Sequence, residues 1–178
     1  DSVADPLGRT TTYSFDAAGN QLSATDPAGH TTWFTYDAYN NRASVRDARS
    51  LGSTDATYAV TTTWDGVHHN KLIETTPPTL QHPAGTTRTW TYTSGSEAAI
   101  GGGVTPARLL KTEVDPIGGI TSYQYDAKGN LRETTDSSGL VTSYTYDELG
   151  RRVTQTQFPT GYPSGITTTY TLDAEGRV

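Results

Sequence analysis

The sequence contains no cysteine and no methionine among its 178 residues. Without cysteine it can form neither a disulfide framework nor a thiolate nucleophile. It has no run of roughly 18 apolar residues, which a membrane-spanning helix needs, and no segment with the features of a signal peptide. Because the chain starts at Asp1 rather than at methionine, we expect a fragment or a processed chain.

Basic residues are also scarce. The chain has 13 Lys and Arg against 19 Asp and Glu, which gives a formal net charge of −6. A nucleic-acid partner requires a cluster of basic residues, and an anionic membrane surface requires a basic run. Neither is present, so we expect no nucleic-acid partner and no membrane insertion. There is also no Walker-type loop and no Gly-x-Ser-x-Gly elbow, so no cofactor is expected.

Helical patterning is missing as well, and large aliphatic residues are few. Leu, Ile, Val and Phe together number 28, a share below one-fifth that often indicates disorder. However, the chain has 11 Tyr and 34 Thr, and these residues favour pleated, half-buried strands. The net charge per residue is also small, which argues against disorder. We therefore predict an all-β fold with little or no helix.

What the sequence does contain is a 21-residue repeat. Asp16 lies 21 residues before Asp37, and Asp126 lies 21 residues before Asp147. Each of these aspartates directly follows an aromatic residue, which is paired with a second aromatic residue two positions earlier. A second signature, Asp-x-x-Gly, keeps the same register and starts at Asp5, Asp26, Asp115 and Asp136. A fixed period of this length indicates units that bury their apolar faces only against their neighbours.

One unit, residues 115–136, can be interpreted element by element. Residues 120–125 alternate in the period-two pattern of a strand. The segment from Asp126 to Gly129 fits a type I hairpin turn with a left-handed glycine. Each unit is thus a β-hairpin followed by a connecting turn. Strands are predicted at 10–15, 31–36, 88–92, 120–125 and 141–146, with return strands near 21–25 and 131–135. Positive φ is predicted at Gly19, Gly129, Gly150 and Gly176.

The repeats are predicted to form a single array over residues 1–178. Regular repeats occupy 1–47 and 113–178, and divergent repeats with loop insertions occupy 48–112. In the divergent part, Thr93 takes the place of the turn aspartate. The hairpins are expected to begin at Phe15, Tyr36, Trp64, Tyr92, Tyr125, Tyr146 and Leu172. The insertions are expected near 47–59, 66–82, 94–108 and 157–165, where any binding function would be grafted.

At these residues the chain resembles the RHS-repeat, or YD-repeat, family, whose pattern is close to Tyr-x-Tyr-Asp-x-x-Gly-Arg-Leu followed by Asp-Pro-x-Gly. Residues 125–131, 146–151 and 173–178 carry the resemblance. It implies a large exported bacterial or cell-surface protein whose repeats form one continuous curved or spiralling sheet. Such a sheet is a segment of a β-shell or filament, and in toxins the shell encloses an effector. The repeat continues after Asp115, so no self-cleaving aspartate is assigned to this chain.

Several side chains have both a chemical and a structural interpretation. The pair His68 and His69 could contribute to a metal site, but neighbouring strand residues point to opposite faces and no third ligand stands at a suitable spacing. Histidines in turns or loops are the expected interpretation. The repeated aspartates could act as acid and base, but their regularity favours turn formation. We therefore expect no metal and no catalytic residue.

The aromatic residues could pack across strands or stack on sugar rings. We predict a non-enzymatic structural segment that joins more of the same parent chain, or stacked copies, through open sheet edges. The alternative is a carbohydrate-binding or adhesive module that uses the aromatic rows and the irregular middle. If such a ligand binds, Trp64 and Trp90 are the expected stacking surfaces.

Overall fold

The structure is a computed structural model that describes residues 1–173 and 175–177. Ala174 and Val178, which the sequence pattern assigns to the last repeat, lie outside the described residues. The described chain consists of strands and turns. It forms no helix, and hence no helix long and apolar enough to cross a membrane.

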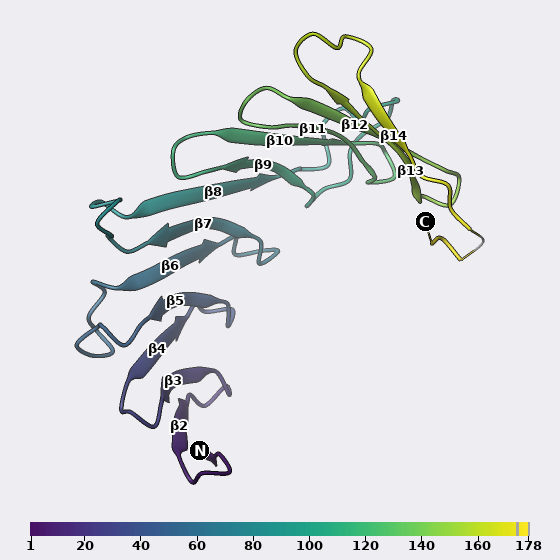
Figure 1. Cartoon of the computed structure of the whole chain (residues 1–178). Coiled ribbons are helices and arrows are strands. Elements are labelled where there is room, and N and C mark those ends of the chain that lie inside the picture. Colours follow the sequence, from purple (N-terminus) through teal and green to yellow (C-terminus); the bar gives the residue numbers. More distant parts are fainter. Residues whose placement is uncertain (174, 178) are drawn as a thin grey trace. The chain divides into compact units, whose positions relative to one another are not determined.

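The strands follow one another along the chain, and each lies beside its neighbours in sequence (Figure 1). They are β1 (Ser2–Ala4), β2 (Thr10–Phe15), β3 (Gln21–Thr25), β4 (Thr31–Tyr36), β5 (Arg42–Arg46), β6 (Ala59–Trp64), β7 (Lys71–Thr76), β8 (Thr86–Tyr92), β9 (Leu110–Val114), β10 (Ile120–Tyr125), β11 (Leu131–Thr135), β12 (Val141–Tyr146), β13 (Arg152–Phe158) and β14 (Ile166–Thr169). The all-β fold of repeated antiparallel hairpins is confirmed. The predicted strands and return strands also lie where the repeat placed them, although β8 begins two residues earlier than expected.

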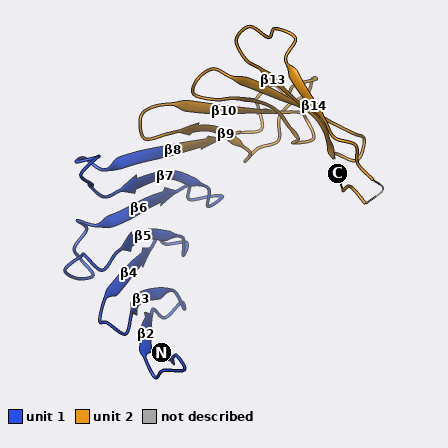
Figure 2. Cartoon of the chain, viewed as in Figure 1, with its two compact units in different colours: residues 1–89 blue, residues 90–178 orange. Residues whose placement is uncertain are grey.

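The chain divides into two compact units, residues 1–89 and 90–178 (Figure 2). The first unit contains β1 to β7 and the start of β8. The second contains the end of β8 and β9 to β14. Each unit is a run of hairpins joined by connecting turns, so the same local geometry recurs in both.

A register shift marks the end of each regular hairpin. In the first hairpin, Ser14 pairs with Ser23, but Phe15 pairs with Gln21. The same shift precedes Tyr36, Trp64, Tyr125 and Tyr146. A bulge of this kind places an extra residue on one strand and redirects the neighbouring side chain. Here it occurs where each aromatic residue meets its turn.

The turn glycines have the predicted backbone conformation. The φ angles of Gly19, Gly129, Gly150 and Gly176 are 86°, 88°, 77° and 82°. In the second repeat Asn40 stands at this place with a φ of 64°. Asparagine is one of the few other residues that adopt the left-handed conformation readily.

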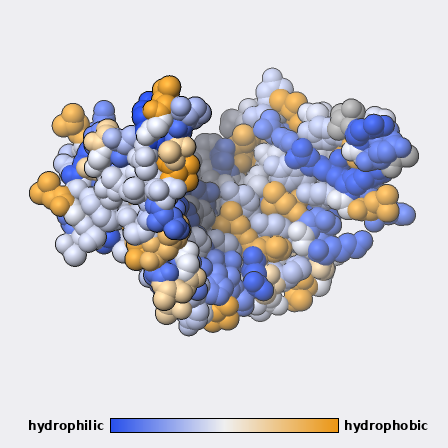
Figure 3. Space-filling model, turned by 90° about the horizontal axis from the view of Figure 1, so that it is seen from below, coloured by the Kyte–Doolittle hydropathy of each residue, from blue (hydrophilic) through white to orange (hydrophobic). Residues whose placement is uncertain are grey.

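Neither unit has a conventional hydrophobic core. Ala59 and Ala99 are the only buried apolar residues of the described chain, and none of its large side chains is fully buried. Apolar residues are scattered among polar ones on the face shown in Figure 3. Several turn tips expose large apolar side chains, including Leu7, Ile117 and Leu149. The sheet is therefore held together mainly by strand pairing and by contacts between neighbouring repeats.

Two features differ from the sequence-based expectation. The segment 66–82, predicted as an insertion, contains β7, because its extra length is divided between the Asp65 turn and the loop after Thr76. The last predicted hairpin start, Leu172, is not in a strand, since β14 ends at Thr169. The turn that follows still forms, with the backbone N–H of Gly176 donating to the carbonyl of Asp173 at 3.0 Å.

The substitution Gly129→Val tests the turn geometry. We expect it to lower the free energy of unfolding by about 1 kcal/mol or more, because a β-branched residue is disfavoured at positive φ. Gly129→Asn is the matched control, since Asn40 already occupies the equivalent place, and it should be milder. Denaturant titrations followed by circular dichroism give both values. Equal stability of the two variants would contradict the left-handed assignment.

Candidate functional site

The repeated aspartates close the hairpin turns with both backbone and side-chain bonds. In the first repeat, the backbone N–H of Asp16 donates to the carbonyl of Asn20 at 2.9 Å. Oδ1 of Asp16 accepts the backbone N–H groups of Ala18 at 2.9 Å and Asn20 at 2.8 Å. One carboxylate oxygen is thus used entirely within its own turn, as turn chemistry predicts.

The second carboxylate oxygen accepts a side-chain donor four residues further on. Oδ2 of Asp16 accepts from Nδ2 of Asn20 at 2.9 Å, and Oδ2 of Asp147 accepts from Nε of Arg151 at 2.6 Å. The same bond forms in the Asp37, Asp126 and Asp173 turns. The preference for Asn or Arg after the turn glycine therefore has a direct physical cause.

These hydrogen bonds lower the pKa values of the turn aspartates. The side-chain bond from Asn20 is the main cause that lowers the pKa of Asp16. The backbone N–H of Arg151 is the main cause that lowers the pKa of Asp147. General acid–base catalysis needs two groups whose pKa values are pushed apart. Repetition instead places like groups in like surroundings.

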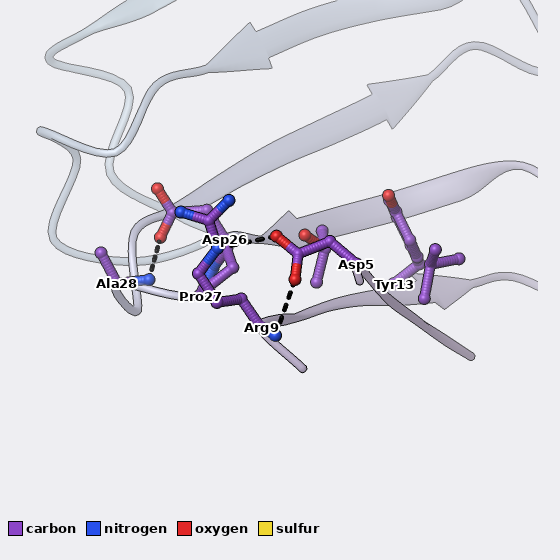
Figure 4. A pocket seen from close by; sticks show the side chains of 8 residues that line it. Asp5, Arg9, Tyr13, Asp26, Pro27 and Ala28 are labelled. Carbon is purple, nitrogen blue, oxygen red and sulfur yellow. Dashed lines mark hydrogen bonds and ion pairs between the residues drawn. The ribbon is translucent and has the colours of Figure 1, made fainter. Parts of the chain in front are cut away.

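A cavity in the first unit illustrates this point (Figure 4). It has a volume of about 590 Å³ and lies between the turns that Asp5 and Asp26 open. Asp5 accepts from the backbone and from Nε of Arg9, and Asp26 accepts from the backbone N–H of Ala28. Both carboxylates are therefore occupied by turn contacts rather than directed at the cavity as a reactive pair.

In several repeats, the aromatic residue before the turn aspartate connects its hairpin to the preceding one. The hydroxyl of Tyr36 donates to the carbonyl of Gln21 at 3.0 Å. Tyr125 donates in the same way to Leu110 at 2.8 Å, and Tyr146 donates to Leu131 at 2.7 Å. Each acceptor is the first residue of its strand, β3, β9 or β11.

Trp64 takes the same structural role. Its indole Nε1 donates to the carbonyl of Arg42 at 3.0 Å, and Arg42 is the first residue of the return strand β5. The ammonium of Lys71 lies over the indole ring, 5.9 Å from the centroid. Trp64 is half-buried and lines a groove of about 370 Å³ together with Tyr36, Arg42, Lys71 and Glu74. The groove combines an aromatic wall with charged and hydrogen-bonding groups.

Trp90, the other predicted stacking surface, lies in β8 at the start of the second unit and is half-buried. Trp64 belongs to the first unit. The two indoles are thus assigned to different units, and any stacking role has to be argued for each one separately.

The face opposite the aromatic pairs carries rows of hydroxyl groups. Ser14 lies between Tyr13 and Phe15, so its side chain points to the other face of the strand. Its hydroxyl is 2.6 Å from that of Ser23 on the paired strand. Equivalent cross-strand pairs are Thr35 with Ser44, Thr91 with Thr112, Thr145 with Thr154, and Thr156 with Thr167. This pairing gives some of the many Thr residues a structural role.

The four histidines all lie in turns or loops. Nδ1 of His30 lies 3.0 Å from Oδ2 of Asp26, and Nδ1 of His68 lies 3.6 Å from Oδ1 of Asp65. His69 contacts Asn41 instead, and His82 is in the loop after β7. Within the described residues, no three His, Asp or Glu side chains are grouped as a metal ion would require.

The loop between β8 and β9 replaces a short hairpin turn. As the repeat register predicts, Thr93 takes the aspartate's place: its hydroxyl accepts the backbone N–H of Leu109 at 3.0 Å. Glu97 accepts from the backbone of Ser94 at 2.9 Å and from Nζ of Lys111 at 3.1 Å. A bond from its own backbone N–H is the main cause that lowers the pKa of Glu97 to about 2. Its carboxylate therefore acts as an anchor for the loop.

Sequence reasoning identified the turn aspartates and glycines but missed the bonds between hairpins. The signal was present, because Tyr or Trp rather than Phe precedes the aspartate in most repeats. Of the three aromatic residues Phe, Tyr and Trp, only Tyr and Trp have a side-chain hydrogen-bond donor. Phe15, which precedes the first turn aspartate, has no such donor.

A sequence profile of the RHS repeat matches residues 2–31, 108–136 and 125–162. The chain belongs to the RHS-repeat family. The matched RHS segments include the Asp16, Asp126 and Asp147 turns and the Tyr125 and Tyr146 bonds described above. No curated protein matches the sequence.

Solved structures also contain chains similar to this RHS-repeat chain. One is a chain in the crystal structure of TcdB2-TccC3, with a TM-score of 0.50 and 13% identity over 92% of this chain and 10% of that one. Another is from the Photorhabdus luminescens Tc holotoxin pore, with a TM-score of 0.49 and 15% identity over 90% of this chain and 9% of that one. The RHS-repeat chain thus spans about a tenth of these chains. At such low identity, the first match supports the fold alone.

The hydroxyl bond between hairpins can be tested with Tyr146→Phe. We expect a loss of about 1 kcal/mol in the free energy of unfolding, because the Leu131 carbonyl loses its donor while the ring is kept. Tyr144→Phe removes a hydroxyl of the same strand that makes no such bond, and should be close to neutral. Thermal and denaturant unfolding would measure both, and similar losses for the two variants would contradict the assignment.

Acid should destabilise the RHS-repeat chain. The pKa of Asp55 falls from 3.8 to about 2, chiefly through the backbone N–H of Leu51, and that of Glu97 falls from 4.5 to about 2. Carboxylates with lowered pKa values stabilise the fold above the unfolded-state values, and this contribution is lost as pH falls through the folded-state values. The melting temperature should therefore drop between pH 4.5 and about 2. Glu97→Gln should be less stable at neutral pH and lose less on acidification, whereas a melting temperature that stays constant down to pH 2 would contradict this account.

Proposed function

We propose that the chain is a non-enzymatic structural segment of an exported RHS-repeat protein, which supplies part of a β-sheet wall. The observation that carries this proposal is a sheet of repeated hairpins with almost no buried apolar residues. In such a sheet, the stabilising contacts join neighbouring repeats, and the described chain has no hydrophobic core of its own. A wall that encloses or displays other parts of a larger protein is the function that suits this construction.

Open sheet edges support the same proposal. β1 and β14 are the first and last strands in the order, and both are exposed along their whole length. An edge strand with free N–H and C=O groups is a template for pairing with another strand. We infer that more of the parent chain, or a stacked copy, pairs there. Chains of the Tc holotoxin, which share this type of fold, are a precedent for such repeats within a multi-chain assembly.

Absence of turnover is part of the proposal. The turn aspartates Asp16, Asp37, Asp126, Asp147 and Asp173 are engaged within their own turns, and their pKa values are all lowered. A catalyst requires unlike groups that converge on one place. We therefore expect no hydrolase or transferase activity that follows the protein through purification.

The edge proposal can be tested by blocking β14. Tyr170 donates its N–H to Val153 on β13, so by strand alternation the N–H of Thr169 points away from β13. Thr169→Pro removes this outward donor and should reduce self-association in sedimentation experiments. Thr168→Pro, one residue earlier, removes an inward donor instead and should mainly reduce stability. A chain that is monomeric at all concentrations, with both edge strands protected from hydrogen exchange, would argue against the proposal.

The alternative, a carbohydrate-binding module, is favoured by one observation, the groove beside Trp64. Arg42, Lys71 and Glu74 offer hydrogen-bonding groups next to the indole, an arrangement suited to a sugar ring. Glycan-array binding that disappears in Trp64→Ala and persists in Trp64→Phe would support this alternative. Binding that requires Trp90 would place the ligand in the second unit. If the unmodified chain binds no glycan, the carbohydrate-binding alternative is wrong and the structural proposal stands.

A further inference from the structure

Neighbouring hairpin turns are connected by side chains as well as by strand pairing. Nδ2 of Asn20 donates to Oδ2 of Asp16 in its own turn at 2.9 Å, and also to Oδ1 of Asn40 in the next turn at 2.8 Å. The two hydrogens of one amide group thus serve two turns. We call such a side-chain hydrogen bond between two neighbouring turns a joint. The Asn20–Asn40 joint contains no group that titrates near neutral pH.

The next joint has the same design with one change. Nδ2 of Asn41 donates to Oδ2 of Asp37 at 2.9 Å, and lies 2.8 Å from Nδ1 of His69 in the following turn. An amide nitrogen can only donate, so Nδ1 of His69 has to accept. The imidazole is therefore neutral in this arrangement, with its proton on Nε2.

His69 is exposed, and its ring has one aromatic neighbour. The ring of Tyr39 packs edge-on against the imidazole, with 5.3 Å between the centroids. His69 itself has a φ of 59°, and its backbone N–H donates to the carbonyl of Asp65 at 3.2 Å. In this turn, Nδ1 of His69 lies beside Asn41.

Several charged and titratable groups lie near the His69 imidazole. Asp37 and Asp65 are carboxylates that attract a protonated imidazole, and His68 in the same turn already faces Asp65. Lys71 is paired with Glu74 at 2.7 Å. Attraction by Asp37 does not restore the Asn41 bond, because a protonated Nδ1 and the amide nitrogen are both donors.

We propose that the Asn41–His69 joint is an acid-sensitive latch between the second and third hairpin turns of the array. At neutral pH the bond is present. A proton taken up at Nδ1 turns this acceptor into a donor, which can no longer accept from Asn41. The stabilisation is therefore lost as pH falls, and the two turns separate locally while the strands remain paired.

Other joints supply a contrast within the same molecule. The Asn20–Asn40 joint keeps its donor and acceptor at every pH in this range. The joint further along uses Nη1 of Arg151, which donates to the carbonyl of Asp173 at 3.1 Å, and a guanidinium keeps its charge. Mild acid should thus loosen one specific place in the described array.

The first test is the protonation state of His69. Nitrogen-15 NMR of the 178-residue chain at pH 7.5 should show a neutral ring with the proton on Nε2. A proton on Nδ1 at this pH would overturn the proposal, because the ring could not then accept from Asn41.

The second test is hydrogen exchange at pH 7.5 and 5.5, corrected for the intrinsic exchange rates. In the unmodified chain, protection of the amides at 39–41 and 69–70 should fall about two- to fourfold, the effect of one exposed hydrogen bond. Protection at 18–20 should stay constant.

His69→Asn is the informative variant, because it copies the Asn20–Asn40 joint and because asparagine tolerates the left-handed conformation. It should abolish the pH-dependent loss at 39–41. His68→Asn removes the neighbouring imidazole and should leave that loss intact. If His69→Asn retains the loss, or if His68→Asn removes it, another group is responsible and the latch is wrong.

Discussion

The bond from Tyr or Trp to the carbonyl of the preceding hairpin is the interaction on which the array depends. In the regular hairpins, the register shift next to the turn skips one residue of the return strand, and carbonyls at the start of the return strands accept a side-chain hydrogen bond. The Tyr36, Tyr125 and Tyr146 hydroxyls satisfy these carbonyls. Because the donor and the acceptor belong to successive repeats, each hairpin is held in register by the one that follows it. The turn aspartate, which comes directly after the donor, fixes the backbone at the same place.

Much of this architecture follows from the sequence because it is local. The turn at Asp126 and Gly129 is specified by residues within five positions of each other, and the neighbouring strands follow from period-two alternation. The pairing of Leu131 with Tyr146 could not be derived this way, since it depends on the bulge. The strand β7 was also missed in part, because an extra residue in the Asp65 turn shifts the local register.

The binding properties were harder to predict than the fold. Trp64 was selected from the sequence as a stacking surface for a ligand, and the structure gives its indole N–H a bond to the Arg42 carbonyl. A residue of the repeat framework therefore also lines a groove of the first unit that contains charged side chains. The sequence could not distinguish these roles, because the same aromatic position supplies the connecting bond in the Tyr36, Tyr125 and Tyr146 repeats as well.

The strand order has a consequence for how the chain reaches its fold. All-β proteins often fold slowly, because their strands pair across long stretches of sequence. Here each strand pairs only with the strands before and after it in the chain. Most of the loops to be closed are short, so a hairpin can form as soon as it has been synthesised. The array can thus grow from one end on the existing edge, and a long polypeptide of this kind need not be complete before its first part is folded.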